Sequence, residues 1–125
     1  MSRDFVYHNE NPYRMEENDC VCRAISKATD MDYFIIQQLL EMSAEVNNCD
    51  TLCVCCYHYL LENVFGLNVR YCDHWETVGD IARQYPNNKV LIRINGHLTT
   101  SDNGIVYDIW DCTQSVVDCY WVIPN

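Results

Sequence analysis

The fold of this chain is decided by the stretch Asn18-Asp19-Cys20-Val21-Cys22-Arg23-Ala24-Ile25-Ser26-Lys27-Ala28. Its apolar side chains recur at the spacing of one helix face. The polar pair at its start can cap a helix, and the polar, aperiodic segment before it, from Asn9 to Asn18, predicts a loop. Cys20 is therefore expected at or near the amino terminus of a helix.

The remaining elements change in type along the chain. Further helices are expected at about Tyr33 to Val46, Leu52 to Val64, and Val78 to Tyr85 with Thr77 as its cap. Strands are expected at Phe5 to Tyr7, Leu67 to Tyr71, Val90 to Ile94, Ile105 to Trp110 and Cys119 to Ile123. Helices followed by an antiparallel sheet predict an α+β fold, and we expect one domain over residues 1–125.

The composition is that of an ordinary folded protein. Apolar residues make up 49% and charged residues 21% of the 125 residues, enough for one core. The amino terminus has no apolar run typical of a signal peptide, and no stretch is apolar enough to span a bilayer. We therefore expect a cytoplasmic protein whose nine cysteines are reduced thiols.

The charge makes nucleic acid an unexpected partner. The chain has 18 acidic and eight basic residues, for a formal net charge of −10. Its Lys and Arg residues form no cluster that could follow a phosphate backbone. We expect neither nucleic acid nor a membrane among its partners.

Cys20 has the setting that a nucleophilic thiol needs. The exposed amides and partial positive charge of a helix amino terminus lower the pKa of a thiol, and the thiolate is the reactive form. The same amides can stabilise an oxyanion. The backbone N–H of Cys20 and the side-chain amide of Asn18 are therefore candidate oxyanion donors.

A cysteine nucleophile also needs a base and a group that orients the base. His97 fits the base, because it starts a predicted strand. If Ser101 to Gly104 form a four-residue hairpin loop, His97 lies directly opposite Asp108. A three-residue loop would instead place it opposite Ile109 and make Asp111 the nearer carboxylate, so Asp111 is the alternative orienting residue.

These motifs resemble a known superfamily. The segment from Glu17 to Ile25 resembles the nucleophile helix of papain-like cysteine peptidases, especially the bacteriocin-processing type with an acidic residue before the cysteine. Gly96-His97 and Tyr107-Asp108-Ile109-Trp110-Asp111 resemble its histidine strand and the next strand, whose orienting residue often precedes a tryptophan by two positions. Together with Tyr120-Trp121, they also resemble a group of short phage and bacterial proteins predicted to have this fold.

The resemblance implies a fold and a chemistry. Amino-terminal helices carrying Cys20 would pack on a sheet carrying His97 and Asp108. The enzyme would cleave an amide or isopeptide bond of a peptide or protein substrate through an acyl-thioester, without a cofactor. The superfamily often has a glutamine oxyanion donor where this chain has Arg14, so Arg14 joins Asn18 as a candidate donor. Two alternatives are a transglutaminase-like acyltransferase and a phage-type inhibitor that binds a host protein without turnover.

Metal binding is the competing interpretation of the cysteines. Cys49, Cys53, Cys55, Cys56 and His58 lie within ten residues, and structural zinc uses such ligands. Their spacing is not that of a paired zinc knuckle. If residues 52–64 form a helix, the side chains point in several directions. We therefore expect no metal site and no stoichiometric zinc.

Overall fold

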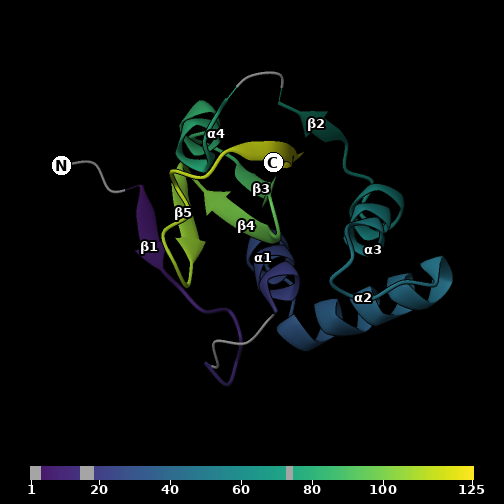
Figure 1. Ribbon diagram of the computed structural model, residues 1–125. Helices are drawn as coiled ribbons and strands as arrows, with labels where there is room; N and C mark the ends of the chain where they lie inside the picture. Colours follow the sequence, from purple (N-terminus) through teal and green to yellow (C-terminus); the bar gives the residue numbers. More distant parts are fainter. Residues whose placement is uncertain (1–3, 15–18, 73–74) are drawn as a thin grey trace.

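The computed structural model describes residues 4–14, 19–72 and 75–125, which form a mixed sheet with helices on both faces (Figure 1). The sheet has six strands in the order β1-β5-β4-β3-β6-β2. The strands are β1 (Phe5–Tyr7), β2 (Val69–Tyr71), β3 (Lys89–Ile94), β4 (His97–Asp102), β5 (Ile105–Asp108) and β6 (Val117–Ile123).

The centre of the sheet is β3, which pairs with β4 on one side and β6 on the other, both antiparallel. Val90, Leu91 and Ile92 are fully buried. A strand covered on both faces has no polar side, which is why this segment reads as a continuous apolar run. Leu91 belongs to the core on one face, and Val90 and Ile92 belong to the core on the other.

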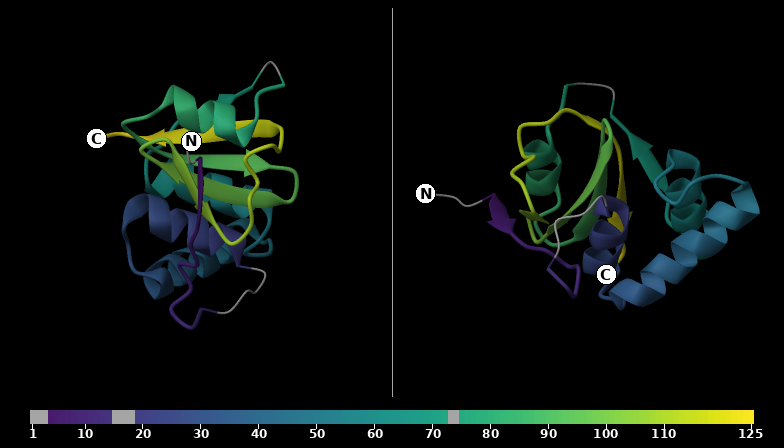
Figure 2. Two further views of the ribbon diagram at one scale, coloured as in Figure 1. Left: turned by 90° about the vertical axis from the view of Figure 1, so that its left-hand side faces the viewer. Right: turned by 60° about the horizontal axis from the view of Figure 1, so that its bottom comes forward.

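Helices cover both faces of the sheet (Figure 2). One face carries α1 (Cys20–Thr29), α2 (Tyr33–Asn47) and α3 (Val54–Tyr59), which continues as the π-helical segment η1 (Leu60–Val64). The other face carries α4 (Val78–Gln84), which begins with a capping box between Thr77 and Asp80. Within the described ranges, no helix is long and apolar enough to cross a membrane.

The α+β class and the positions of the predicted helices and strands are confirmed. The prediction of an antiparallel sheet built only from the second half of the chain is wrong in one respect, because a strand near the amino terminus joins the sheet in parallel. Phe5 pairs with Val106, so that β1 joins β5 in parallel at one edge. The strand β1 has only three residues and is followed by a loop. The sequence therefore carries no signal for the strand with which β1 pairs. The third helix also begins at Val54 rather than Leu52, because Cys53 has an extended backbone.

The hairpin between β4 and β5 has a different register from the predicted one. Asp102 pairs with Ile105, which leaves a two-residue turn instead of a four- or three-residue loop. Asn103 and Gly104 both have positive φ, 51° and 82°, as a tight hairpin turn requires. The predicted register, with a four-residue loop, differs from the observed register by two residues. A shift by an even number of residues leaves each side chain on the same face of the sheet. Asp108 therefore stays on the face of His97, as a diagonal rather than a direct neighbour.

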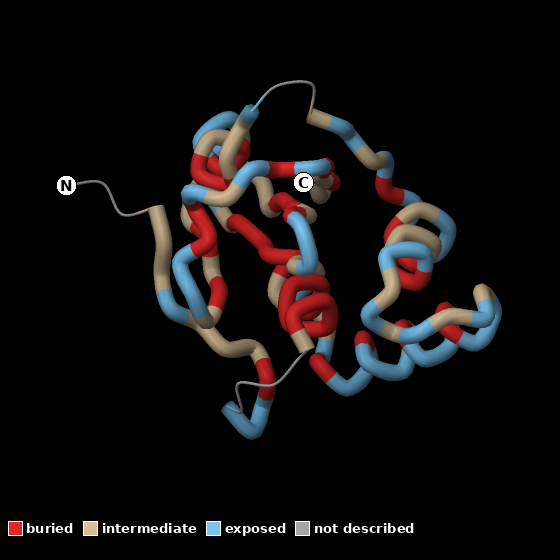
Figure 3. Tube along the Cα trace, viewed as in Figure 1, coloured by how far each residue is buried: buried red, intermediate tan, exposed pale blue. Residues whose placement is uncertain are grey.

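The burial pattern marks α1 as the central helix. Figure 3 shows that α1 is buried along nearly its whole length, whereas α2 presents much of its surface to solvent. α1 packs against β4 on one side and α2 on another. Its first residue is therefore fixed against the strand that begins with His97.

Candidate active site

Cys20 is the first residue of α1, as the sequence predicted, and only 8% of its surface is exposed. It lines a cleft of about 350 Å³ together with His97. Asp19 occupies the N-cap position but makes no side-chain capping bond to the first turn. The side chain of Asp19 thus leaves the first amides of α1 available to a ligand.

His97 and Asp108 form a direct hydrogen bond. His97 Nε2 lies 2.6 Å from Asp108 Oδ2, and both side chains are largely buried. The backbone N–H of Ile109 donates to Asp108 Oδ1 at 2.7 Å, which fixes the carboxylate. The ring of Trp110 lies next to the imidazole, with 5.0 Å between the ring centroids. Asp108 thus holds His97 in one orientation, with Nδ1 left for a second partner.

Cys20 lies in the same cleft as His97, and the two groups shift each other's pKa. Burial would raise the pKa of the Cys20 thiol, but hydrogen bonds to His97 and to the Leu98 backbone hold this pKa below its ordinary value. Burial would lower the pKa of His97, whereas hydrogen bonds with Asp108, Cys112 and Cys20 raise it to about 11. Since both pKa shifts favour the charged form, the pair favours thiolate and imidazolium over thiol and imidazole.

The orienting carboxylate is ionised in this setting. Burial would raise the pKa of Asp108, but its hydrogen bond with His97 lowers it. Arg23 adds a positive charge, with its Nη1 lying 3.8 Å from Asp108 Oδ1. The charges of this site therefore alternate along the series Arg23, Asp108, His97 and Cys20.

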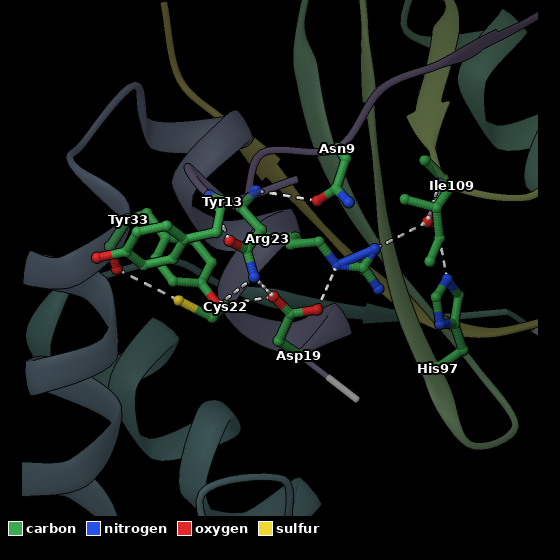
Figure 4. A network of polar contacts seen from close by, with 10 residues as sticks. Asn9, Tyr13, Asp19, Cys22, Arg23, Tyr33, His97 and Ile109 are labelled. Carbon is green, nitrogen blue, oxygen red and sulfur yellow. Dashed lines mark hydrogen bonds and ion pairs between the residues drawn. The ribbon is translucent and has the colours of Figure 1, made fainter. Parts of the chain in front are cut away.

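The role of Arg23 was missed by the sequence analysis. Figure 4 shows Arg23 between Asp19 and the strand of His97. Its Nε lies 2.7 Å from Asp19 Oδ1, and the pair is almost fully buried. Asp19 Oδ2 also accepts hydrogen bonds from the Tyr33 hydroxyl at 2.6 Å and from Asn11 Nδ2 at 3.0 Å. The i, i+4 spacing of Asp19 and Arg23 was the available signal.

Two other predicted residues do not join this group. Asp111 is exposed, and its Oδ1 accepts from the backbone N–H and the hydroxyl of Thr113 at 3.0 and 2.6 Å, whereas the carboxylate bonded to His97 is that of Asp108. Arg14 is exposed and lines a separate pocket formed by residues 7–9. Asn18 lies outside the described residues. The backbone N–H of Cys20 is the oxyanion candidate that remains among those described.

The cysteine-rich window divides into two groups. Cys56 is buried and donates to the Leu40 carbonyl at 3.2 Å, while His58 Nε2 lies 3.2 Å from Arg93 Nη1. The Sγ atoms of Cys49, Cys53 and Cys55 instead lie within 4.8 Å of one another. The expectation that these side chains point in several directions thus holds for Cys56 and His58 but not for the other three, because the helix starts only at Val54.

Comparisons of this chain with protein-family models, with curated proteins and with solved structures give no match. The chemistry of the site therefore has to be inferred from its own residues and geometry.

Proposed function

We propose that this chain is a cysteine-nucleophile hydrolase of the papain-like type, which cleaves amide bonds of peptides or proteins with Cys20, His97 and Asp108. The observation that carries this proposal is the linked series at the cleft. Cys20 shares the cleft with an imidazole that lowers the pKa of its thiol and whose Nε2 is held 2.6 Å from a buried carboxylate. Cys20 and His97 both line the open cleft, so that a substrate can reach the sulfur.

The roles of the three residues follow from their positions. The Cys20 thiolate attacks the carbonyl carbon of the substrate, and the backbone N–H of Cys20 stabilises the oxyanion. His97 then gives its proton to the leaving amine, and the C–N bond breaks to leave a thioester on Cys20. Water attacks the thioester, His97 accepts a proton from this water, and the thiolate leaves as the carboxylic acid product departs.

The cleft favours an extended peptide with an apolar side chain near the cleaved bond. Val21, Leu52, Val54 and Tyr57 contribute apolar lining, and charged residues complete the cleft. Apolar walls with a few polar groups are typical of sites that bind organic ligands. The substrate chain would lie across the first turn of α1, next to the turn that precedes His97.

A peptide electrophile tests the nucleophile. We expect a peptidyl acyloxymethyl ketone to modify Cys20 in the native protein and to leave Cys20→Ala unmodified, as measured by intact mass and peptide mapping. Cys22→Ala is the matched control, because Cys22 lies in the same helix and donates to the Tyr33 carbonyl at 3.3 Å, while burial raises its pKa to about 12. Similar modification of several cysteines would contradict the assignment.

Turnover tests the reaction class. Hydrolysis of a fluorogenic peptide library by the native protein, abolished in Cys20→Ala, is the expected result. Labelling of Cys20 with transfer of the acyl group to an added amine would point to an acyltransferase. A reactive Cys20 without turnover of any library member would instead favour an interaction protein with this fold.

A further inference from the structure

A group of three cysteines lies on the surface before and at the start of α3. Cys49 follows α2, Cys53 is the N-cap residue of α3, and Cys55 lies in its first turn. Cys49 and Cys53 are partly buried, and Cys55 is exposed. Their three Sγ atoms lie within 4.8 Å of one another, with 3.1 Å between those of Cys53 and Cys55.

The backbone fixes two of these cysteines by local hydrogen bonds. Asn48 ends α2 in the left-handed conformation, and the N–H of Cys49 donates to the Ala44 carbonyl at 2.9 Å. The N–H of Cys53 donates to the Asp50 carbonyl at 3.0 Å, which closes a turn between them. Cys49 and Cys53 are thus brought together by the fold and do not depend on a ligand.

The separations fit a thiolate-bound metal ion. Sulfur lies about 2.3 Å from zinc, so three sulfurs around one ion are about 4 Å apart. The Sγ atoms of the three cysteines therefore need to move by only about 1 Å. Thiolates select soft ions such as Zn(II) and Cu(I) over Mg(II) and Ca(II). The exposure of Cys55 gives an ion access and leaves a fourth coordination position to water.

We propose that Cys49, Cys53 and Cys55 form a binding site for one soft, thiophilic metal ion. Each thiol loses its proton to solvent when its sulfur binds the ion, so that three protons are released for each ion and no electron is transferred. The site replaces the sequence-based expectation of no metal. It differs from a buried structural zinc site, because Cys55 is exposed and Cys49 and Cys53 lie only partly buried at the margin of the core.

The position of the site links it to the cleft. Leu52 and Val54, the neighbours of Cys53 in the chain, both line the cleft that holds Cys20. An ion on Cys53 therefore fixes the segment that forms one wall of this cleft. This consequence depends on the proposed function, whereas the binding of the ion does not.

A titration with zinc tests the site. The background is Cys20→Ala, which removes the candidate nucleophile as a ligand. Under reducing conditions, we expect one Zn(II) for each chain in competition with a chromophoric chelator, and a thiolate-to-metal absorption band with Co(II). Cys55→Ser should weaken zinc binding by at least about tenfold, since even changes to residues behind the metal ligands have effects of this size.

The control variants are Cys72→Ser, a partly buried cysteine outside the cluster, and Cys112→Ser. His97, Asp108 and Cys112 also lie close enough to hold an ion, although His97 and Asp108 are already bonded to each other. Both control variants should keep the zinc affinity of the background. Absence of bound zinc, equal affinity in Cys55→Ser, or loss of zinc only in Cys112→Ser would each overturn the proposal.

Discussion

The lowered pKa of Cys20 depends chiefly on one imidazole, that of His97. His97 lowers the pKa of the Cys20 thiol through both a hydrogen bond and its charge. The burial that opposes this shift is independent of His97. In His97→Ala, the pKa of Cys20 should therefore rise, and alkylation of Cys20 by iodoacetamide near neutral pH should slow by about tenfold or more. Mass mapping after brief treatment at a series of pH values measures this change.

His58→Ala is the matched control, because His58 lies on α3 and pairs with Arg93. It should leave the alkylation rate of Cys20 unchanged. An unchanged rate in His97→Ala would show that the helix terminus alone activates the thiol, and it would remove His97 from the mechanism.

The carboxylate of Asp108 should matter less than the sulfur of Cys20. An asparagine at this position can still accept a hydrogen bond from the imidazole but carries no charge to stabilise the imidazolium. We expect Asp108→Asn to reduce peptide-electrophile labelling roughly tenfold, and Asp108→Ala to reduce it further. Asp111→Asn, which changes an exposed carboxylate bonded to Thr113, should have no effect. A similar loss in Asp111→Asn would contradict the choice of Asp108.

At the level of elements, α1 carries both the candidate nucleophile Cys20 and the buried cation Arg23. Arg23 pairs with Asp19 at 2.7 Å, and both side chains are about nine-tenths buried. Removal of one partner of a buried ion pair leaves the other charge without compensation and costs about 3 to 5 kcal/mol. We therefore expect Arg23→Met to lower the free energy of unfolding by about 3 kcal/mol, measured by urea denaturation.

Lys27→Met gives the comparison within the same helix. Lys27 pairs with Asp102 at 3.5 Å, and both side chains are only partly buried. An ion pair near the surface contributes at most about 1 kcal/mol. If Arg23→Met and Lys27→Met lower the free energy of unfolding equally, Arg23 contributes no more to stability than a surface cation. Its contact with Asp108 would then have no structural importance.

The hairpin shows how far sequence reasoning reaches at this level. The Asn103-Gly104 pair is a strong signal for a two-residue turn, but the prediction used a longer loop that began at Ser101. The pairing of His97 with Asp108 nevertheless holds, because the error was an even number of residues. A three-residue loop would have turned Asp108 to the opposite face.

At the level of the whole molecule, the features predicted correctly from the sequence are those that depend on local periodicity. The helix start at Cys20 and the buried strand at Val90 to Ile92 follow from spacing and composition. The parallel pairing of β1 with β5 and the meeting of Cys49 with Cys53 depend on where the chain turns in space, and short polar segments give little signal for that. The ion pair between Asp19 and Arg23 could have been predicted from the sequence, because the two residues are four apart at the start of one helix.

The dependence of stability on pH reports the charge state of the whole site. The pKa of His97 is raised from 6.5 to about 11, so its imidazolium stabilises the fold below pH 6.5, and this contribution is lost as the pH rises toward 11. The pKa of Cys20 is lowered from 9.0, so its thiolate stabilises the fold above pH 9.0, and this contribution is lost as the pH falls. If the folded pair is thiolate and imidazolium throughout this range, the folded pair and the unfolded pair carry the same number of protons between pH 6.5 and 9.0.

The two slopes therefore cancel in the native protein over this range, and Cys20→Ser should reveal the slope of His97 alone. In this variant Asp108 still holds the imidazolium, so folding retains a proton that the unfolded chain has lost. We expect the free energy of unfolding of Cys20→Ser to fall relative to the native protein by about 1 kcal/mol per pH unit, measured by urea denaturation between pH 6.5 and 9.0. Cys72→Ser should follow the native curve. Parallel curves for the native protein and Cys20→Ser would mean that Cys20 is a neutral thiol in the folded state, and the thiolate and imidazolium pair would then be wrong.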